Sequence, residues 1–194
     1  ISMHKAKAVS AAKKELKKDI AFFRFVQYEF YRQWGELKKY ANDCGIEIVG
    51  DTPIYCALDS VEVWSQPKLF WLDKKRRPVC VAGCPPDAFS PTGQLWGNPL
   101  YDWEYHKKTN FEWWTERIRN AAKLYDIVRI DHFRGFESYY TIPFGNEDAT
   151  VGEWKKQLVF WERQITGIGQ SMNDICLGGT LLFTIFLNFF VTQD

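Results

Sequence analysis

Residues 127–136, Ile-Val-Arg-Ile-Asp-His-Phe-Arg-Gly-Phe, constrain the fold of this chain more than any other stretch. The alternation predicts a short buried strand with Val128 and Ile130 on one face and Arg129 and Asp131 on the other. The Arg129 guanidinium would then hold the Asp131 carboxylate ionised and oriented. A carboxylate aimed from the C-terminal end of a parallel strand is suited to act as a nucleophile in glycosidic-bond chemistry. A structural Arg–Asp ion pair that closes the strand accounts for the decapeptide equally well.

Helices and strands alternate before this strand. Residues 20–43 predict an amphipathic helix that ends at Gly45, with apolar positions Phe22, Val26, Phe30, Trp34, Leu37 and Ala41. Residues 46–50 predict a short strand that delivers Asp51 to its C-terminal end. Residues 104–124 predict a second long helix, with Phe111, Trp114, Ile118, Ala121 and Ala122 facing inward. The order of strand, helix, loop, helix and strand is typical of a βα barrel segment.

Shorter elements are predicted between these. Asp59 begins a short helix with Glu62 as its capping-box partner, and Pro67 limits its length. Residues 69–72 and 79–82 predict two hairpin strands around an exposed basic turn.

Residues 83–103 contain four prolines, three glycines and four aromatic residues. This composition predicts a loop that continues neither a helix nor a central strand. Long irregular loops are usually functional or disordered, and the aromatic content argues against disorder.

Four segments together carry a resemblance to a known family. They are Phe25 to Trp34, Ile48 to Trp64, Gly83 to Trp103 and Val128 to Phe136. With these segments the chain resembles glycoside hydrolase family 77, the 4-α-glucanotransferases, over roughly residues 15–155. Several rare residues at fixed spacing make chance agreement improbable.

The resemblance implies an α/β fold that is part of a (β/α)₈ TIM barrel with an elaborated active-site loop. The chain has 194 residues, whereas a complete barrel typically needs about 250. We therefore expect residues 1–155 to form a fragment of the catalytic barrel.

The resemblance also implies a reaction, a retaining double displacement on α-1,4-glucans and maltooligosaccharides. Asp131 matches the nucleophile, and Arg129 would keep its pKa low and fix its rotamer. His132 would donate to sugar hydroxyls. Asp51 looks like the family's supporting carboxylate, and the loop positions that match the glucan site are Asp87, Gln94 and Trp96.

Each assignment has a structural alternative. Asp51 would instead cap the following turn, and His132 would be an ordinary strand-end histidine. Trp96 and Phe89 would anchor the loop on the barrel, since aromatic residues dominate cores.

Composition narrows the partners. The net charge is +1, with 25 basic and 24 acidic residues, so no nucleic acid or membrane partner is expected. The basic run from Lys5 to Lys18 is read as a solvated helical face.

The five cysteines are an odd number without repeated Cys-x-x-Cys spacing, and the three histidines are scattered. No metal or cofactor is therefore expected, and reduced thiols and the lack of a signal peptide favour a cytoplasmic protein. Cys80 and Cys84 are read as small fillers, with a redox pair as the alternative.

The character of the chain changes after residue 155. The family would continue into a strand with an Ala-Glu-Asp-Leu-Gly motif, which is missing here. We expect residues 156–194 to be a divergent tail of foreign or frameshifted origin, with an apolar core helix or a marginal membrane anchor as alternatives. Three hypotheses follow: a transferase segment that is inactive in isolation, an α-amylase-type hydrolase, or an inactive fragment that binds glucans. The residues 85–101 favour transferase over hydrolase.

Overall fold

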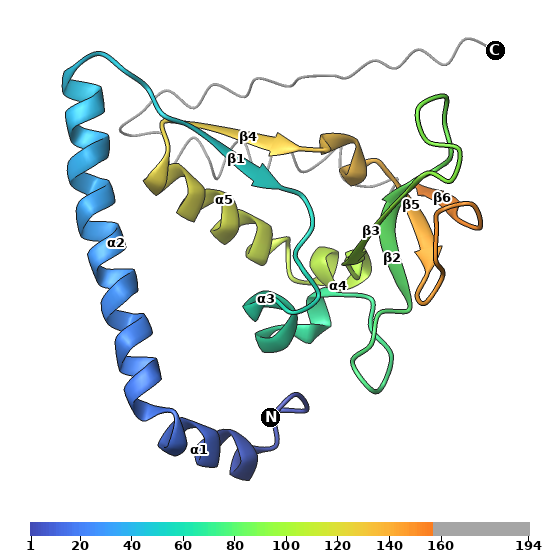
Figure 1. Ribbon diagram of the computed structural model, residues 1–194, viewed down its shortest axis with the longest axis horizontal. Helices are drawn as coiled ribbons and strands as arrows, with labels where there is room; N and C mark the ends of the chain where they lie inside the picture. Colours follow the sequence, from blue (N-terminus) through green and yellow to red (C-terminus); the bar gives the residue numbers. More distant parts are fainter. Residues whose placement is uncertain (157–194) are drawn as a thin grey trace.

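A computed structural model describes residues 1–156 of the chain (Figure 1). The tail predicted over residues 156–194 therefore lies outside the described residues, except for its first position. Within residues 1–156 no helix is both long and apolar enough to span a membrane.

The chain begins with two consecutive helices, α1 (Ala6–Glu15) and α2 (Lys17–Asp43). The predicted helix over residues 20–43 is confirmed, and Gly45 follows its end with a φ of 74° that favours glycine. Helix α2 stands beside the rest of the molecule (Figure 1). It is attached at its C-terminal half, where the Trp34 indole donates to the Leu124 carbonyl at 2.7 Å and Lys38 pairs with Asp126 at 3.1 Å.

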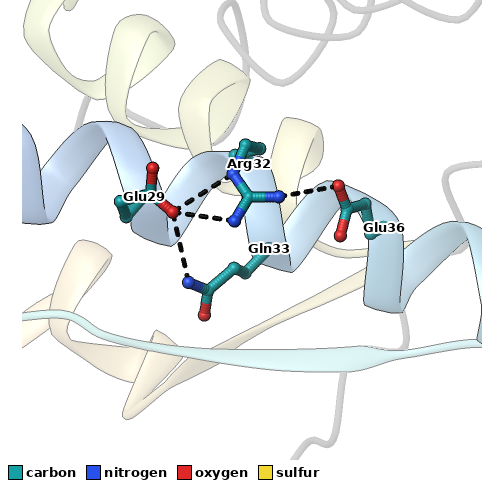
Figure 2. Close-up of polar contacts among 4 residues, drawn as sticks. All are labelled: Glu29, Arg32, Gln33 and Glu36. Atoms are coloured by element: carbon teal, nitrogen blue, oxygen red, sulfur yellow. Dashed lines mark hydrogen bonds and ion pairs between the residues drawn. The ribbon is translucent and has the colours of Figure 1, made fainter.

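Most of the apolar stripe predicted on α2 is exposed within the described part of the chain. Phe22 is 61% and Leu37 53% exposed. Polar side chains are linked over one stretch of the same helix, because Arg32 bonds to both Glu29 and Glu36, and Gln33 also donates to Glu29 (Figure 2). The hydrogen bond from Arg32 lowers the pKa of Glu29.

Strands β1 (Val49–Pro53) and β4 (Ile127–Asp131) form a two-stranded parallel sheet. The prediction that residues 127–131 form a strand is confirmed, but only Val128 of that strand is buried in the described part of the chain. The predicted strand over residues 46–50 begins later, so that Asp51 lies in the middle of β1 rather than after it. Helix α5 (Glu112–Leu124) runs along this sheet (Figure 1) and leads directly into β4.

The helix predicted over residues 104–124 is two helices, α4 (Trp103–Lys108) and α5. The helical conformation is interrupted at Asn110 and Phe111, which both adopt left-handed backbone angles. The Thr109 hydroxyl donates to two carbonyls at the end of α4, at 3.1 Å each. The break lets Phe111 enter the core, where it is 2% exposed, and Trp114 and Ile118 follow on the buried side of α5.

A second sheet has four antiparallel strands in the order β3-β2-β5-β6. The strands are β2 (Cys80–Cys84), β3 (Gln94–Pro99), β5 (Ser138–Pro143) and β6 (Glu153–Lys156). The prediction that all of residues 83–103 form a loop was therefore wrong for two parts of this segment. Its first residues finish β2, and the edge strand β3 occupies its second half, because Gly83 has no side chain to keep the two strands apart.

Two smaller predictions also need correction. Helix α3 (Val61–Ser65) is capped by Ser60, whose hydroxyl accepts from the Val63 N–H at 3.3 Å, and not by Asp59. The predicted hairpin is reduced to a bridge between Leu72 and Pro78, because β2 pairs with β3 and β5 instead. The prediction that Pro67 limits the length of the helix is confirmed, because α3 ends at Ser65 and Pro67 begins a separate 3₁₀ turn (Pro67–Leu69).

The core between the two sheets is mostly aromatic. Its largest fully buried side chains include Trp114, Tyr101 and Phe136. This core joins α4 and α5 to the segment that follows β1, so it fixes the positions of the strand ends where the candidate residues lie. The described chain is thus a mixed α/β segment, and its two sheets do not close into a barrel within residues 1–156.

Candidate functional site

Asp51, Arg129 and Asp131 lie on one exposed face of the β1–β4 pair. Asp51 is directly beside Arg129 in the parallel register, and Asp131 is the last residue of β4, beside Pro53. Because the two strands are parallel, both C-terminal ends meet at the same edge of the sheet. The structure therefore brings together the three charged residues that the sequence singles out.

The partner of Arg129 differs from the predicted one. Its Nε donates to Asp51 Oδ1 at 3.0 Å, and its Nη2 donates to Asp51 Oδ2. The expected Arg129–Asp131 hydrogen bond was wrong, because the strand register places Asp51 opposite the guanidinium. The hydrogen bond from Arg129 lowers the pKa of Asp51 and raises that of Arg129 itself.

The Asp131 side chain accepts no hydrogen bond from any residue within 1–156. Its charge still acts on Arg129, whose pKa it helps to raise, although the Asp51 hydrogen bond contributes more. The structural alternative to a catalytic role for Asp131 was an Arg129–Asp131 ion pair. In the structure Arg129 forms its ion pair with Asp51 instead. Asp51 has a structural partner, whereas no other described side chain engages the Asp131 oxygens.

His132 follows Asp131 in a left-handed backbone conformation, with φ 53° and ψ 45°, and precedes a 3₁₀ turn (Phe133–Phe136). Its half-buried ring meets Trp96 edge-on, with 4.9 Å between the centroids, and lies 6.3 Å from the Tyr55 ring. Burial lowers the pKa of His132, while the Asp131 charge opposes this effect. A neutral imidazole offers one donor and one acceptor, which suits sugar hydroxyls.

Gln94 and Trp96 both lie on β3, and the Trp96 indole donates to the Gln94 side-chain oxygen at 3.0 Å. Trp96 is half-buried, so part of its ring remains open to solvent. Its contact with His132 brings β3 of the second sheet against the end of β4. The structure therefore groups Gln94, Trp96 and His132 into one cluster.

Asp87 has a local structural role. Its carboxylate accepts from the N–H groups of Phe89 at 2.8 Å and Ser90 at 2.7 Å, which closes the turn between β2 and β3. Phe89 at this turn is 87% exposed, so it does not anchor the loop to the described part of the chain. The described contacts of Asp87 are all within its own turn.

Sequence reasoning missed Tyr55 and Arg117. Tyr55 is 8% exposed, and its ring touches both Trp96 and His132. Its position four residues after Asp51, inside a segment that resembles the family, was the available signal. Arg117 gave no signal, because a basic residue in the middle of a helix is usually solvated.

No group of three or more metal-binding side chains occurs among residues 1–156. The redox-pair alternative for Cys80 and Cys84 was wrong, because they occupy the two ends of β2. Four residue steps along the strand separate their Cα atoms by about 13 Å, beyond the reach of a disulfide. Burial raises the pKa of both thiols, as expected for fillers.

A shallow hollow of about 530 Å³ lies elsewhere, between α1 and α3, and is lined in part by His4, Lys13 and Trp64. It contains none of the candidate residues. In the described part of the chain, Asp51, Arg129 and Asp131 are exposed, so this part of the candidate site lies at the surface.

Comparisons with known proteins agree with these features. The family model described as 4-alpha-glucanotransferase, Glyco_hydro_77, matches residues 1–172. The 4-alpha-glucanotransferase of Clostridium butyricum is 55% identical over 157 residues, which cover 80% of this chain and 32% of that protein. The Streptococcus pneumoniae protein with the same description is 55% identical over 152 residues, covering 78% of this chain and 30% of its own length.

Among solved structures, the amylomaltase of Streptococcus agalactiae in complex with acarbose superposes with a TM-score of 0.82 and 42% identity. The match covers 93% of this chain and 35% of that one. An amylomaltase from Corynebacterium glutamicum, at 18% identity and a TM-score of 0.62, supports the fold alone. The chain spans about a third of the length of the Clostridium butyricum, Streptococcus pneumoniae and Streptococcus agalactiae proteins, and the match covers 19% of the Corynebacterium glutamicum chain.

Proposed function

The chain belongs to glycoside hydrolase family 77, the 4-alpha-glucanotransferases, and from this membership we propose that its candidate site takes part in the transfer of α-1,4-glucan units between maltooligosaccharides. The proposal includes the finer fold assignment, in which the β1–β4 pair with α5 is a segment of a (β/α)₈ barrel. It also includes a cytoplasmic location, with which the free cysteines of the described residues are compatible.

In this proposal Asp131 is the nucleophile of a retaining double displacement. Its carboxylate attacks the anomeric carbon of the donor glucan, and the glycosidic oxygen leaves with a proton from a general acid. The 4-hydroxyl of an acceptor sugar then attacks the anomeric carbon of the covalent intermediate and gives its proton to the conjugate base of the general acid. This step breaks the bond to Asp131, regenerates the acid and restores the original configuration. We assign the general acid to no described residue.

One observation carries the proposal. Asp131 has no hydrogen-bonding side-chain partner within residues 1–156, while the adjacent Arg129 is held by Asp51 at 3.0 Å. The fixed guanidinium lies on the same face without occupying the Asp131 oxygens, and this leaves these oxygens free to attack in the proposed reaction.

The remaining candidate residues bind the glucan. An exposed indole face such as that of Trp96 stacks on the apolar face of a pyranose, while the Gln94 amide and the His132 imidazole bond to hydroxyl groups. The exposed turn around Asp87 and Phe89 would cover the intermediate and favour a sugar acceptor over water. The acarbose bound to the Streptococcus agalactiae amylomaltase supports a glucan-like ligand.

A chimera tests the nucleophile. Residues 1–156 replace the matching part of the Clostridium butyricum enzyme, and the chimera is compared with its Asp131→Asn and Asp148→Asn variants. Asp131→Asn should abolish maltotriose disproportionation and the covalent glycosyl intermediate seen by mass spectrometry, because an amide is a poor nucleophile. Asp148 caps an exposed turn through Thr150, so its variant is the matched control.

Near-normal disproportionation by the Asp131→Asn chimera would overturn the assignment. Release of glucose without longer products by the unsubstituted chimera would favour the α-amylase-type hydrolase. Glucan binding without any turnover would favour the inactive glucan-binding fragment.

A further inference from the structure

Arg117 lies on α5, outside the set of candidate residues, yet it holds the C-terminal end of β1. Its Nη1 donates to the Ile54 carbonyl at 3.0 Å, and its Nη2 donates to the Pro53 carbonyl at 2.5 Å. The same Nη1 is 3.3 Å from the Tyr101 hydroxyl, which itself donates to the Ile54 carbonyl at 2.6 Å. Two groups from different parts of the core therefore converge on one carbonyl oxygen.

The guanidinium is itself held in place by two indole rings. Its central carbon lies 5.2 Å from the Trp113 ring centroid and 5.0 Å from that of Trp114. Trp114 is 1% exposed, so this side of the contact belongs to the rigid core. Arg117 thus connects the core to the backbone at Pro53 and Ile54.

Tyr55 is the next residue after this fixed backbone. Its ring lies 6.2 Å from Trp96, 6.3 Å from His132 and 6.0 Å from the stacked Tyr101 ring. The Tyr55 hydroxyl is also closely packed against the backbone of Gly135, because a Cβ at Gly135 would lie 3.2 Å from this hydroxyl. Tyr55 is therefore packed beneath both rings to which the proposed function assigns glucan binding.

We propose that Arg117 is a positioning residue of the candidate site, which acts through the end of β1 to hold Tyr55 beneath Trp96 and His132. The inference rests on the proposed function for the glucan-binding role of those two rings. The contacts require an arginine. A lysine ammonium is a compact point charge and lacks the planar fork that reaches both carbonyls while it faces the two indoles.

The first experiment measures the packing of the site without any ligand. The pKa of His132 is determined by NMR in the 194-residue chain, where only three histidines need to be assigned. The ring is lined by Tyr55 and Trp96, and the charges that act on it are those of Asp131 and Arg134. Arg117→Met should free Tyr55, admit water to the imidazole and raise the His132 pKa towards its ordinary value.

Arg119→Met is the matched control, because Arg119 lies two residues further along α5 and pairs with Glu116. It should leave the His132 pKa unchanged. Circular dichroism establishes that each variant is folded, and Arg117→Lys takes the place of Arg117→Met if the latter is not. An unchanged His132 pKa in the folded Arg117 variant overturns the proposal.

A double-mutant cycle tests whether the effect passes through Tyr55. Tyr55→Ala should raise the His132 pKa by itself, and Arg117→Met should add nothing in that background. Additive shifts would overturn action through Tyr55.

Maltoheptaose titrations, followed by tryptophan fluorescence, separate this inference from the proposed function. Arg117→Met should weaken binding roughly tenfold, and Arg119→Met should not. Absence of binding by the unsubstituted chain would count against glucan recognition by this chain, while the His132 measurement would still decide the role of Arg117.

Discussion

Acidification should destabilise the chain through His106, a residue of α4 that is 0% exposed. Its Nε2 lies 3.1 Å from the Leu69 carbonyl, so we expect the neutral tautomer that donates this bond. Its Nδ1 is buried without a hydrogen-bond partner among the described residues. The imidazole is surrounded by aromatic rings, including those of Tyr101 and Trp113, which give a second proton no acceptor.

The magnitude follows from the pKa of this group. Burial lowers the pKa of His106 from 6.5 to about 4. Between these values the unfolded chain binds a proton that the folded chain does not bind, so the free energy of unfolding rises with pH. The stability is therefore complete above pH 6.5 and is lost as the pH falls to about 4. The pKa difference corresponds to about 3 kcal/mol.

Urea unfolding of the 194-residue chain at pH 7.5 and pH 4.5 measures this effect. The unsubstituted chain should lose about 2–3 kcal/mol between the two conditions, and His106→Gln should lose correspondingly less because it cannot titrate. His4→Gln is the matched control. At pH 4.5 the unfolded chain also begins to protonate Asp51, Asp73 and Asp126, whose folded pKa values are lowered. This loss is common to all three chains, so the difference between the unsubstituted and His106→Gln chains isolates His106. The same loss in the unsubstituted and His106→Gln chains would refute the reasoning.

Three further predictions follow from other parts of the structure. Gly83→Ala should lower the free energy of unfolding in urea by about 1–3 kcal/mol, because its Cβ would lie 2.5 Å from Ile142 Cδ1 and even closer to the Gln94 carbonyl oxygen. The control Gly35→Ala on α2 meets nothing within 4 Å and should raise that free energy by about 1 kcal/mol. Equal effects of the two substitutions would contradict the packing of β2 against β3. Trp96→Ala should weaken maltoheptaose binding to the chimera by about 1–3 kcal/mol in calorimetry, and unchanged affinity would assign Trp96 to packing. The 194-residue chain alone should convert no maltotriose, because protonation of the leaving oxygen needs a second carboxyl group and contributes about 10²–10⁴-fold; robust turnover would reveal an acid that we have not assigned.

Local patterns sufficed to predict the elements that carry the site. The apolar spacing of α2 and the alternation of Val128 and Ile130 are properties of short segments, and both elements form as expected. The break between α4 and α5 was not predicted, because no proline or glycine marks it. Burial of Phe111 stabilises a left-handed conformation that its own side chain disfavours. Local propensity predicted one continuous helix here, and tertiary packing of Phe111 divides it into α4 and α5.

Contacts between distant segments could not be read from the sequence. Arg129 and Asp131 are two residues apart on one strand, so a local argument pairs them. The preferred partner, Asp51, is 78 residues away and is brought close only by the parallel register of β1 and β4. Arg117 reaches Ile54 across 63 residues because α5 packs against β1.

The register also changes the physical account of Asp131. In the proposed function the Asp131 oxygens bond to the sugar, so a bidentate pair with Arg129 would engage these oxygens and make the carboxylate a weaker nucleophile. With Asp51 as the acceptor, the guanidinium stays fixed on the same face, and the Asp131 charge helps to raise the pKa of Arg129. The two carboxylates therefore differ within residues 1–156, since Asp51 orients the cation and Asp131 accepts no hydrogen bond there. In the proposed function it is the unengaged carboxylate that meets the substrate.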